Sequence, residues 1–186
     1  MKIDYFSYLN VSNYRGMKKD AITTDPGYFS RYINLVPDVD LAEALEASLE
    51  AVLALDGAAL EEKGSYAYAP GKWTVKDLFQ HIIDTERVFT YRALMFARND
   101  KQTIPGMDQD LFADNAETGH RTVKDLLDEL ISLRKATIAL FYSFTPAALM
   151  RTGICWKWEM SVLGVGFIIA GHQIHHLNIL REKYQL

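Results

Sequence analysis

Hydrophobic residues recur at helical spacing in several stretches of the chain. The first, DLAEALEASLEAVLALDG, places leucines at positions 41, 45, 49, 53 and 55, and Gly57 favours a stop at its end. The second, WTVKDLFQHIIDTERVFTYRALMFARND, begins after Thr74, a residue type that caps helix N-termini. Asp77 stands three residues later, in the position of a capping-box acid. Both stretches therefore predict long amphipathic helices.

Two further helices are expected in the second half of the chain. RTVKDLLDELISLRKATIALFYSF has Thr122 as its N-cap and ends before Pro146, and the last helix runs from about Ser161 to Lys183. Alternation of apolar and polar residues at strand spacing is nowhere convincing. The pattern predicts an all-α protein, a bundle of four long helices with a short additional helix.

The connecting segments divide the chain. Residues 1–27 lack a sustained period and end in the turn signal DPG, so we interpret them as an irregular N-terminal extension to a domain over residues 28–186. Residues 57–72 form a loop. Residues 100–121 form a polar, turn-rich connection whose length is typical of functional segments. A second loop with Trp156 and Trp158 precedes the last helix, and both loops are expected to line a cavity.

The last helix carries three of the five histidines of the protein, in GHQIHH. At about 100° per residue, His172 and His176 lie in line within an apolar stripe that includes Val165 and Ile169, whereas His175 lies to one side. Two buried imidazoles need partners, either a metal ion or hydrogen-bonding groups of the core. If one ion is bound, His172 and His176 are the pair that can share it.

His81 is the histidine of the second helix, where Leu78, Ile82 and Phe89 mark the buried face. It falls at the border of that face, in line with Thr85. By itself it is either a boundary residue or a third ligand. Three histidines from two helices would leave a coordination position open, as in catalytic zinc sites.

Composition and charge exclude several classes. A formal charge of −4 gives no basic field for DNA or RNA, so we expect no nucleic-acid partner. The longest nearly apolar stretch, SVLGVGFIIAG, is too short to span a bilayer, and the N-terminal residues lack a signal-peptide run. The single cysteine, Cys155, rules out an internal disulfide. We therefore expect a cytoplasmic protein without membrane contact.

Two stretches together carry a family resemblance. YAPGKWTVKDLFQHIIDTERVFTYRALMFARND, followed by IIAGHQIHHLNIL, resembles the DinB-like superfamily, which includes the YfiT-like proteins. The resemblance covers about Tyr28 to Tyr184, and its most specific parts are KWTVKDLFQH, DTER and GHxxHH. It implies a four-helix bundle with a long crossover and a divalent metal ion, zinc or nickel. The implied ligands are His81, His172 and His176, and the three-histidine pattern is complete here.

The resemblance also implies a range of activities. Members usually carry the label of metal-dependent hydrolase, in which the ion activates water against a small-molecule substrate. Other relatives are transferases and isomerases that use low-molecular-weight thiols. The alternatives are a metal-binding bundle without turnover, serving as a sensor, scaffold or stress protein, and a structural dimer whose histidines are hydrogen-bonded. The substrate cannot be derived from these residues.

Further residues have weaker claims on the site. Asp77 and Asp84 could orient His81, although a helix cap and a solvated face explain them equally simply. Glu86 and Arg92 could form a buried ion pair or contact substrate.

Three more candidates stand outside the second helix. Glu159 could act as a base or complement the dipole of the last helix. Cys155 has no neighbour that would activate its thiol, and His120 is expected to be solvated.

A second apolar patch on the last helix bears on assembly. Phe167, Ala170, Ile174 and Leu177 lie opposite the histidine stripe. Such a helix is either sandwiched in its own chain or used between chains. Members of the superfamily often dimerise through bundle faces, so we expect a homodimer.

Overall fold

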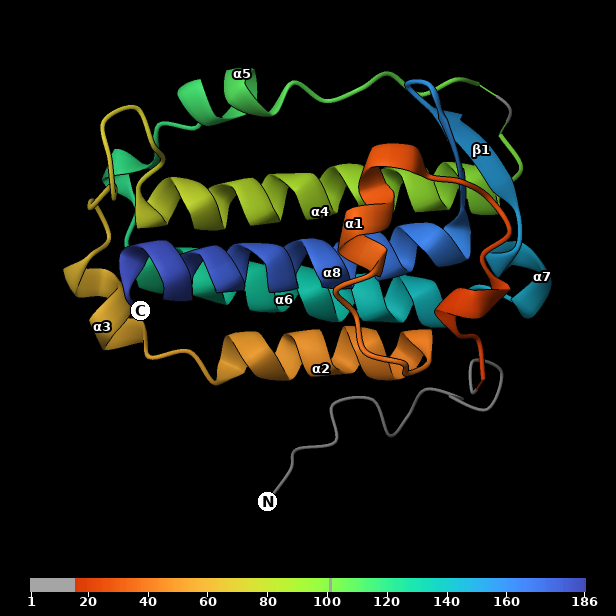
Figure 1. Ribbon diagram of the computed structural model, residues 1–186, viewed down its shortest axis with the longest axis horizontal. Coiled ribbons are helices and arrows are strands. Elements are labelled where there is room, and N and C mark those ends of the chain that lie inside the picture. Colours follow the sequence, from red (N-terminus) through yellow and green to blue (C-terminus); the bar gives the residue numbers. More distant parts are fainter. Residues whose placement is uncertain (1–15, 101) are drawn as a thin grey trace.

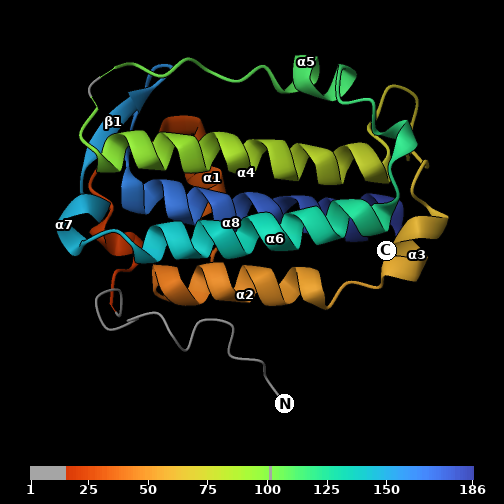
Figure 2. The same cartoon turned by 180° about the vertical axis from the view of Figure 1, so that it is seen from behind.

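The computed structural model describes residues 16–100 and 102–186. Its long helices lie side by side along one direction, as Figures 1 and 2 show from opposite sides. They are α2 (Leu41–Leu53), α4 (Val75–Ala97), α6 (Val123–Tyr142) and α8 (Val162–Ile179). The predicted four-helix bundle is confirmed. Short helices complete it: α1 (Ser30–Ile33), α3 (Gly57–Glu62), α5 (Gln109–Asp114), α7 (Pro146–Leu149) and a π-helical turn (Leu180–Tyr184) that extends α8.

The predicted N-caps hold α4 and α6. The Thr74 hydroxyl accepts from the Asp77 backbone N–H at 3.1 Å, and the Asp77 carboxylate accepts from the Thr74 N–H at 2.9 Å. Thr122 and Asp125 form the same reciprocal pair, at 3.1 and 3.0 Å. Each capping box satisfies backbone donors that a helix start leaves free, so these two helices begin where the sequence predicts.

The order of the helices requires one long connection. α4 and α6 run in the same direction, so residues 98–122 must return along the length of the bundle, over α4 (Figure 1). This connection carries α5 and a 3₁₀ turn at Thr118–His120. The crossover predicted by the resemblance is therefore present, and it covers the side of α4 that faces away from α2.

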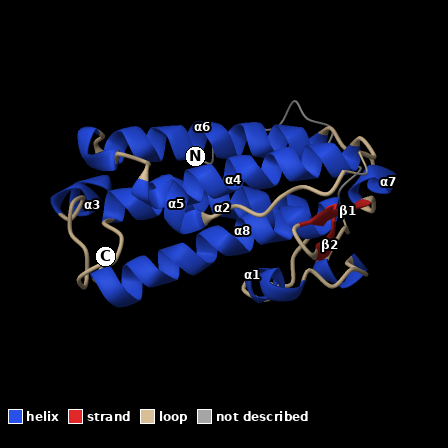
Figure 3. Cartoon of the chain, turned by 90° about the horizontal axis from the view of Figure 1, so that it is seen from above, coloured by secondary structure: helices blue, strands red, loops and turns tan. Residues whose placement is uncertain are grey.

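The all-α fold class is confirmed, but the structure adds one short hairpin that the sequence pattern did not indicate. β1 (Thr152–Cys155) pairs antiparallel with β2 (Trp158–Ser161), and Cys155 stands opposite Trp158 (Figure 3). The hairpin turns at Trp156, whose φ is 56°. Asparagine and glycine are the usual residues at such a position, so the strongest sequence signal for a hairpin is missing. Strands of four residues are also too short to show a period.

One boundary differs from the prediction. Gly57 begins α3 instead of stopping a helix, because Asp56 caps the new helix by accepting from the N–H groups of Ala58 and Ala59. Residues 57–62 of the predicted loop 57–72 are therefore helical. The last helix begins after Ser161, as predicted, and Glu159 lies before it on β2, where it is exposed.

A buried ion pair links the helices at mid-length. Arg134 of α6 donates through Nε and Nη2 to the two carboxylate oxygens of Glu86 on α4, at 2.9 and 2.8 Å, and both side chains are almost fully buried. Thr137 also donates to Glu86, at 2.7 Å. The third donor group of Arg134 contacts Ser48 on α2, and Gln173 of α8 donates to the Ser48 carbonyl at 2.7 Å. Of the two alternatives for Glu86, the buried ion pair is the one found, but its partner is Arg134 and not Arg92.

The second apolar patch of the last helix is used within the chain. Phe167, Ala170 and Leu177 are at most 4% exposed, and Phe167 belongs to the main core cluster. Of the two alternatives, the sandwiched helix is the one found. The patch therefore gives no support to the expected homodimer. No helix in the described ranges is long and apolar enough to cross a membrane.

Part of the N-terminal extension packs on the bundle. Lys18 forms an isolated antiparallel bridge with Asp40, and Met17, Ala21 and Ile22 contact the core. Residues 1–15 of the predicted extension lie outside the described residues. The boundary at residue 27 thus stays a prediction.

Removing one member of the buried ion pair should destabilise the bundle strongly. Arg134→Met would leave the Glu86 carboxylate buried without its cation, at a cost of about 3–5 kcal/mol in the free energy of unfolding. A matched control is Arg87→Met, because the Arg87–Glu129 pair is half exposed and such pairs contribute about 0–1 kcal/mol. Urea unfolding of both variants measures the difference. Equal losses would contradict a special role for the buried pair.

Candidate metal centre

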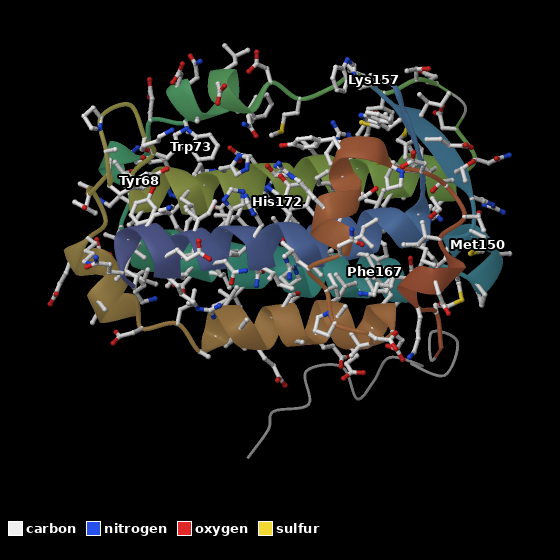
Figure 4. The ribbon with its side chains drawn as sticks, viewed as in Figure 1. Tyr68, Trp73, Met150, Lys157, Phe167 and His172 are labelled. Carbon is white, nitrogen blue, oxygen red and sulfur yellow. The ribbon has the colours of Figure 1, made fainter. Side chains whose placement is uncertain are left out.

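The three histidines come from two neighbouring helices. His81 is on α4, and His172 and His176 are one turn apart on α8, which packs along α4. All three side chains are buried, with 6%, 5% and 6% of their surface exposed. Figure 4 places His172 near the middle of the molecule, between α8 and α4. The structure brings together the three residues that the resemblance singles out.

Their Nε2 atoms converge. The Nε2 atom of His172 lies 3.1 Å from that of His81 and 3.0 Å from that of His176. One ligand atom from each of the three lies within 4.8 Å of the others. No fourth histidine, cysteine or carboxylate joins this cluster among the described residues. The arrangement is a donor set of three imidazole nitrogens.

Burial keeps the three imidazoles neutral. It lowers the pKa of His81 to about 4 and that of His176 to about 2, and nearby histidines add to both effects. The pKa of His172 lies well below its ordinary value for the same reasons, burial first. Each ring therefore keeps a nitrogen lone pair at neutral pH.

Groups around the triad fix the ring orientations. The Thr85 hydroxyl lies 3.5 Å from Nδ1 of His81, one helical turn further along α4. The Trp73 indole packs against the His81 ring at 4.6 Å between centroids with the planes tilted by 40°, and the Tyr32 ring meets that of His172 edge-on at 5.1 Å. Nδ1 of His176 is buried and has no hydrogen-bond partner within the described part of the chain.

A close approach of two backbones puts Tyr32 in place. A side chain at Gly171 would overlap the carbonyl oxygen of Tyr32, so only glycine lets α1 rest on α8 at this point. Figure 1 shows α1 lying across α8. Gly171, the residue before His172, thus lets α1 pack closely on α8, so that Tyr32 forms one wall of the site.

A cavity of about 830 Å³ adjoins the triad. His81 and His172 line it, together with aromatic residues of the N-terminal segment, the hairpin and α4. The crossover contributes Gly106 to Gln109, and the hairpin contributes Cys155 to Trp158. Both segments that were expected to line a cavity do so. His176 faces a smaller hollow of about 250 Å³ beside Trp73.

The weaker candidates on α4 have structural roles. Asp77 caps α4 and accepts a hydrogen bond from Thr118 at 2.5 Å, so it does not orient His81. Asp84 accepts from Gln80 at 2.9 Å, and burial raises its pKa. Neither carboxylate contacts the imidazole.

The remaining candidates divide between cavity and surface. His120 is exposed, as expected, and Glu159 is exposed on β2. Cys155 lines the cavity, but burial raises the pKa of its thiol more than the nearby Arg92 lowers it, so an activated nucleophile is not supported. His175 is half-buried against the Tyr32 ring, at 5.5 Å between centroids, and stays outside the triad.

Sequence reasoning missed the residues around the triad. Thr85 was placed in line with His81, four residues later on the same helix face, but it was given no role at the site. Trp73 and Tyr32 reach the site from a loop and a short helix, where no period indicates the direction of a side chain. A tertiary structure was needed to find them.

The fold and the site define a class: helical bundles with three histidines from two helices gathered beside a cavity. The sequence model of the DinB superfamily matches residues 40–180, and the chain belongs to that superfamily. A relative from Oceanobacillus iheyensis, provisionally named as a metal-dependent hydrolase, is 25% identical over 118 residues, covering 63% of this chain and 68% of the relative.

A solved structure shares the fold. YfiT from Bacillus subtilis, described as a probable metal-dependent hydrolase with an unusual four-helix bundle topology, superposes with a TM-score of 0.61. The match covers 84% of this chain and 86% of YfiT at 17% sequence identity. At that identity the likeness concerns the fold alone.

The depressed histidine pKa values predict acid sensitivity of the metal-free protein. The unfolded chain binds protons on these rings near pH 6.5, whereas folded His81 does so only near pH 4. Stability therefore falls as the pH drops below 6.5, by about 1.4 kcal/mol per pH unit for each such histidine. Urea unfolding between pH 6.5 and 5 should show this slope, reduced in His81→Gln and unchanged in the exposed control His120→Gln. An equal slope in all three proteins would refute the assignment.

Proposed function

We propose that the chain is a metal-dependent hydrolase of a small molecule, with a divalent ion, zinc or nickel, held by His81, His172 and His176. One observation carries the proposal: three buried, uncharged imidazole nitrogens converge beside a cavity. The name of the Oceanobacillus relative supports the same activity.

The donor spacing fits such an ion. Imidazole nitrogens bind zinc at about 2.0–2.1 Å, so two ligands at the tetrahedral angle lie about 3.3 Å apart. The separations of 3.0 and 3.1 Å to His172 are close to this value. Imidazole ligation suits nickel as well as zinc. The donor set supports either metal.

An ion bound there would supply a Lewis acid and would acidify a coordinated water. The chain positions the substrate next to it, since two of the three histidines line the cavity. Thr85 can accept from Nδ1–H of His81, which would leave its Nε2 lone pair free for the ion. Asp108 is the carboxylate among the described cavity residues, and it caps α5. The described cavity residues include no other carboxylate that could act as a general base. This favours activation of the water by the metal itself.

Metal content should depend on the three histidines and on no neighbour. Elemental analysis of protein purified without a histidine tag should find about one divalent ion per chain. His81→Ala and His176→Ala should lose it, whereas the adjacent control His175→Ala should retain it. Metal that persists in His81→Ala would shrink the site to the last helix. Wild-type protein that stays empty after incubation with zinc and nickel would end the proposal.

Activity should follow the metal. Ester and amide substrates should be hydrolysed by the loaded wild type and not by His172→Ala. Turnover that appears only when a low-molecular-weight thiol is added would identify the transferase or isomerase instead. Loaded protein without any turnover would favour the non-catalytic bundle.

The assembly and the location stay predictions. The expected homodimer is now supported by the resemblance alone, because Phe167, Ala170 and Leu177 of the apolar patch on α8 are buried in their own chain. Light scattering after size-exclusion chromatography tests it: a mass of twice 21.2 kDa supports the dimer, and a mass of 21.2 kDa contradicts it. The cytoplasmic location and the lack of a nucleic-acid partner are likewise retained as expectations.

A further inference from the structure

The cavity contains a buried cation for which the described residues supply no counter-charge. Arg92 of α4 lines the cavity and is only 3% exposed. Its Nη2 donates to the Pro105 carbonyl at 3.3 Å, and its Nε has no hydrogen-bond partner among the described residues. Within the same residues, none of the ion pairs includes Arg92. Arg134, by contrast, is buried to the same degree and fully paired.

A buried guanidinium in this state is costly to maintain. Isolated charges lose several kcal/mol of hydration, and proteins normally pair them. Burial lowers the pKa of the Arg92 guanidinium, and Cys155, which lines the same cavity, is the ionisable group that acts against this. The ring of Phe89, 5.0 Å from the guanidinium carbon, supports the side chain but does not neutralise it. The missing partner is an anion.

We propose that Arg92 anchors the carboxylate of a small organic acid with an apolar body, bound in this cavity. The planar fork of arginine matches a carboxylate. One buried cation balances one carboxylate, whereas a phosphate group brings a charge of about −1.5 to −2 and three strong acceptors. Aromatic side chains form the walls, including Phe29, Tyr32, Phe89 and Trp158. These aromatic walls suit an apolar body of the ligand between Arg92 and the histidines.

The electrostatics of the entrance favour an anion. Lys157 also lines the cavity, and its ammonium lies over the exposed Trp156 ring at 4.2 Å from the centroid. Figure 4 shows Lys157 at the hairpin end of the molecule, away from His172. The one carboxylate on the described walls, that of Asp108, accepts from the N–H groups of Asp110 and Leu111. On the described walls of the cavity, the two cations of Arg92 and Lys157 therefore outnumber the one carboxylate of Asp108.

The position of Arg92 specifies the shape of the ligand. It follows His81 by eleven residues on one helix, which corresponds to about 16 Å along the axis. The acid group therefore binds at the opposite end of the cavity from the histidines. If the cavity is the substrate site, which rests on the proposed function, the substrate is an acid whose reacting bond is separated from its carboxylate by an apolar spacer. The binding of the acid does not depend on that function.

Calorimetric titration with matched probes tests the anchor. Phenylbutyrate and phenylbutyramide share their apolar body and differ in charge. The full chain, stripped of metal by a chelator, should bind the acid roughly ten to a hundred times more tightly than the amide. Using metal-free protein prevents the acid from binding to an ion instead. Equal affinities, or no measurable binding of either probe, would overturn the proposal.

Two variants assign the discrimination to one residue. Arg92→Met should bind acid and amide with equal affinity, while Arg98→Gln, at an exposed arginine just after the end of the same helix, should behave like wild type. Thermal unfolding gives an independent readout. A structural arginine would lower the melting temperature when removed, whereas an unpaired anchor should leave it unchanged or raise it. A preference for the acid that survives in Arg92→Met, or a large loss of stability there, would refute the assignment.

The outcomes separate this proposal from the proposed function. Metal-free wild type that prefers the acid supports the anchor even if the histidines never bind an ion. Protein that binds one ion per chain but treats acid and amide alike supports the metal centre and refutes the anchor.

Discussion

The ion pair between Glu86 and Arg134 constrains the rest of the structure, because neither charge can stay buried without the other. It joins α4 to α6, and contacts through Ser48 and Gln173 extend it to α2 and α8. Such a layer limits how each helix can rotate. His81 precedes Glu86 by five residues and therefore points about 140° away around α4. The rotation of α4 about its axis that buries the ion pair on one side of the helix thus points His81 toward the cavity on the other side.

The two polar layers differ in how they are satisfied. In the core layer the ion pair is complete, with both carboxylate oxygens of Glu86 accepting from Arg134, while Oε1 of Gln173 lacks a partner among the described residues. The layer of the three histidines is held together by facing nitrogens, and Nδ1 of His176 lacks a partner in the described part of the chain. Unsatisfied buried groups tend to mark function, because structure alone would select against them. The difference separates the paired charges of Glu86 and Arg134, which support the bundle, from the three histidines, which are available to a ligand.

The helices could be predicted because their signals are local. Leucines at helical spacing and the capping boxes at Thr74 and Thr122 depend on residues within one or two turns. The hairpin depends on a turn at Trp156 that lacks the expected residues, and the partner of Glu86 lies 48 residues away. In the site, His172 and His176 followed from one helix, while His81 was ambiguous until two helices were compared. The aromatic walls come from segments without a period, so they could not be placed.

The cavity is assembled from two kinds of sequence. The three histidines, Arg92 and the hairpin lie within the stretch that matches the superfamily, residues 40–180, whereas Tyr28, Phe29 and Tyr32 precede it. The wall that α1 forms is attached through a close backbone contact at Gly171 and through Tyr32 and Ile33, which belong to the main core cluster. Tyr28, by contrast, is half exposed and lines the cavity without belonging to that core. This position can therefore change without disturbing the four helices or the three histidines, so that the shape of the cavity can vary separately from its chemistry.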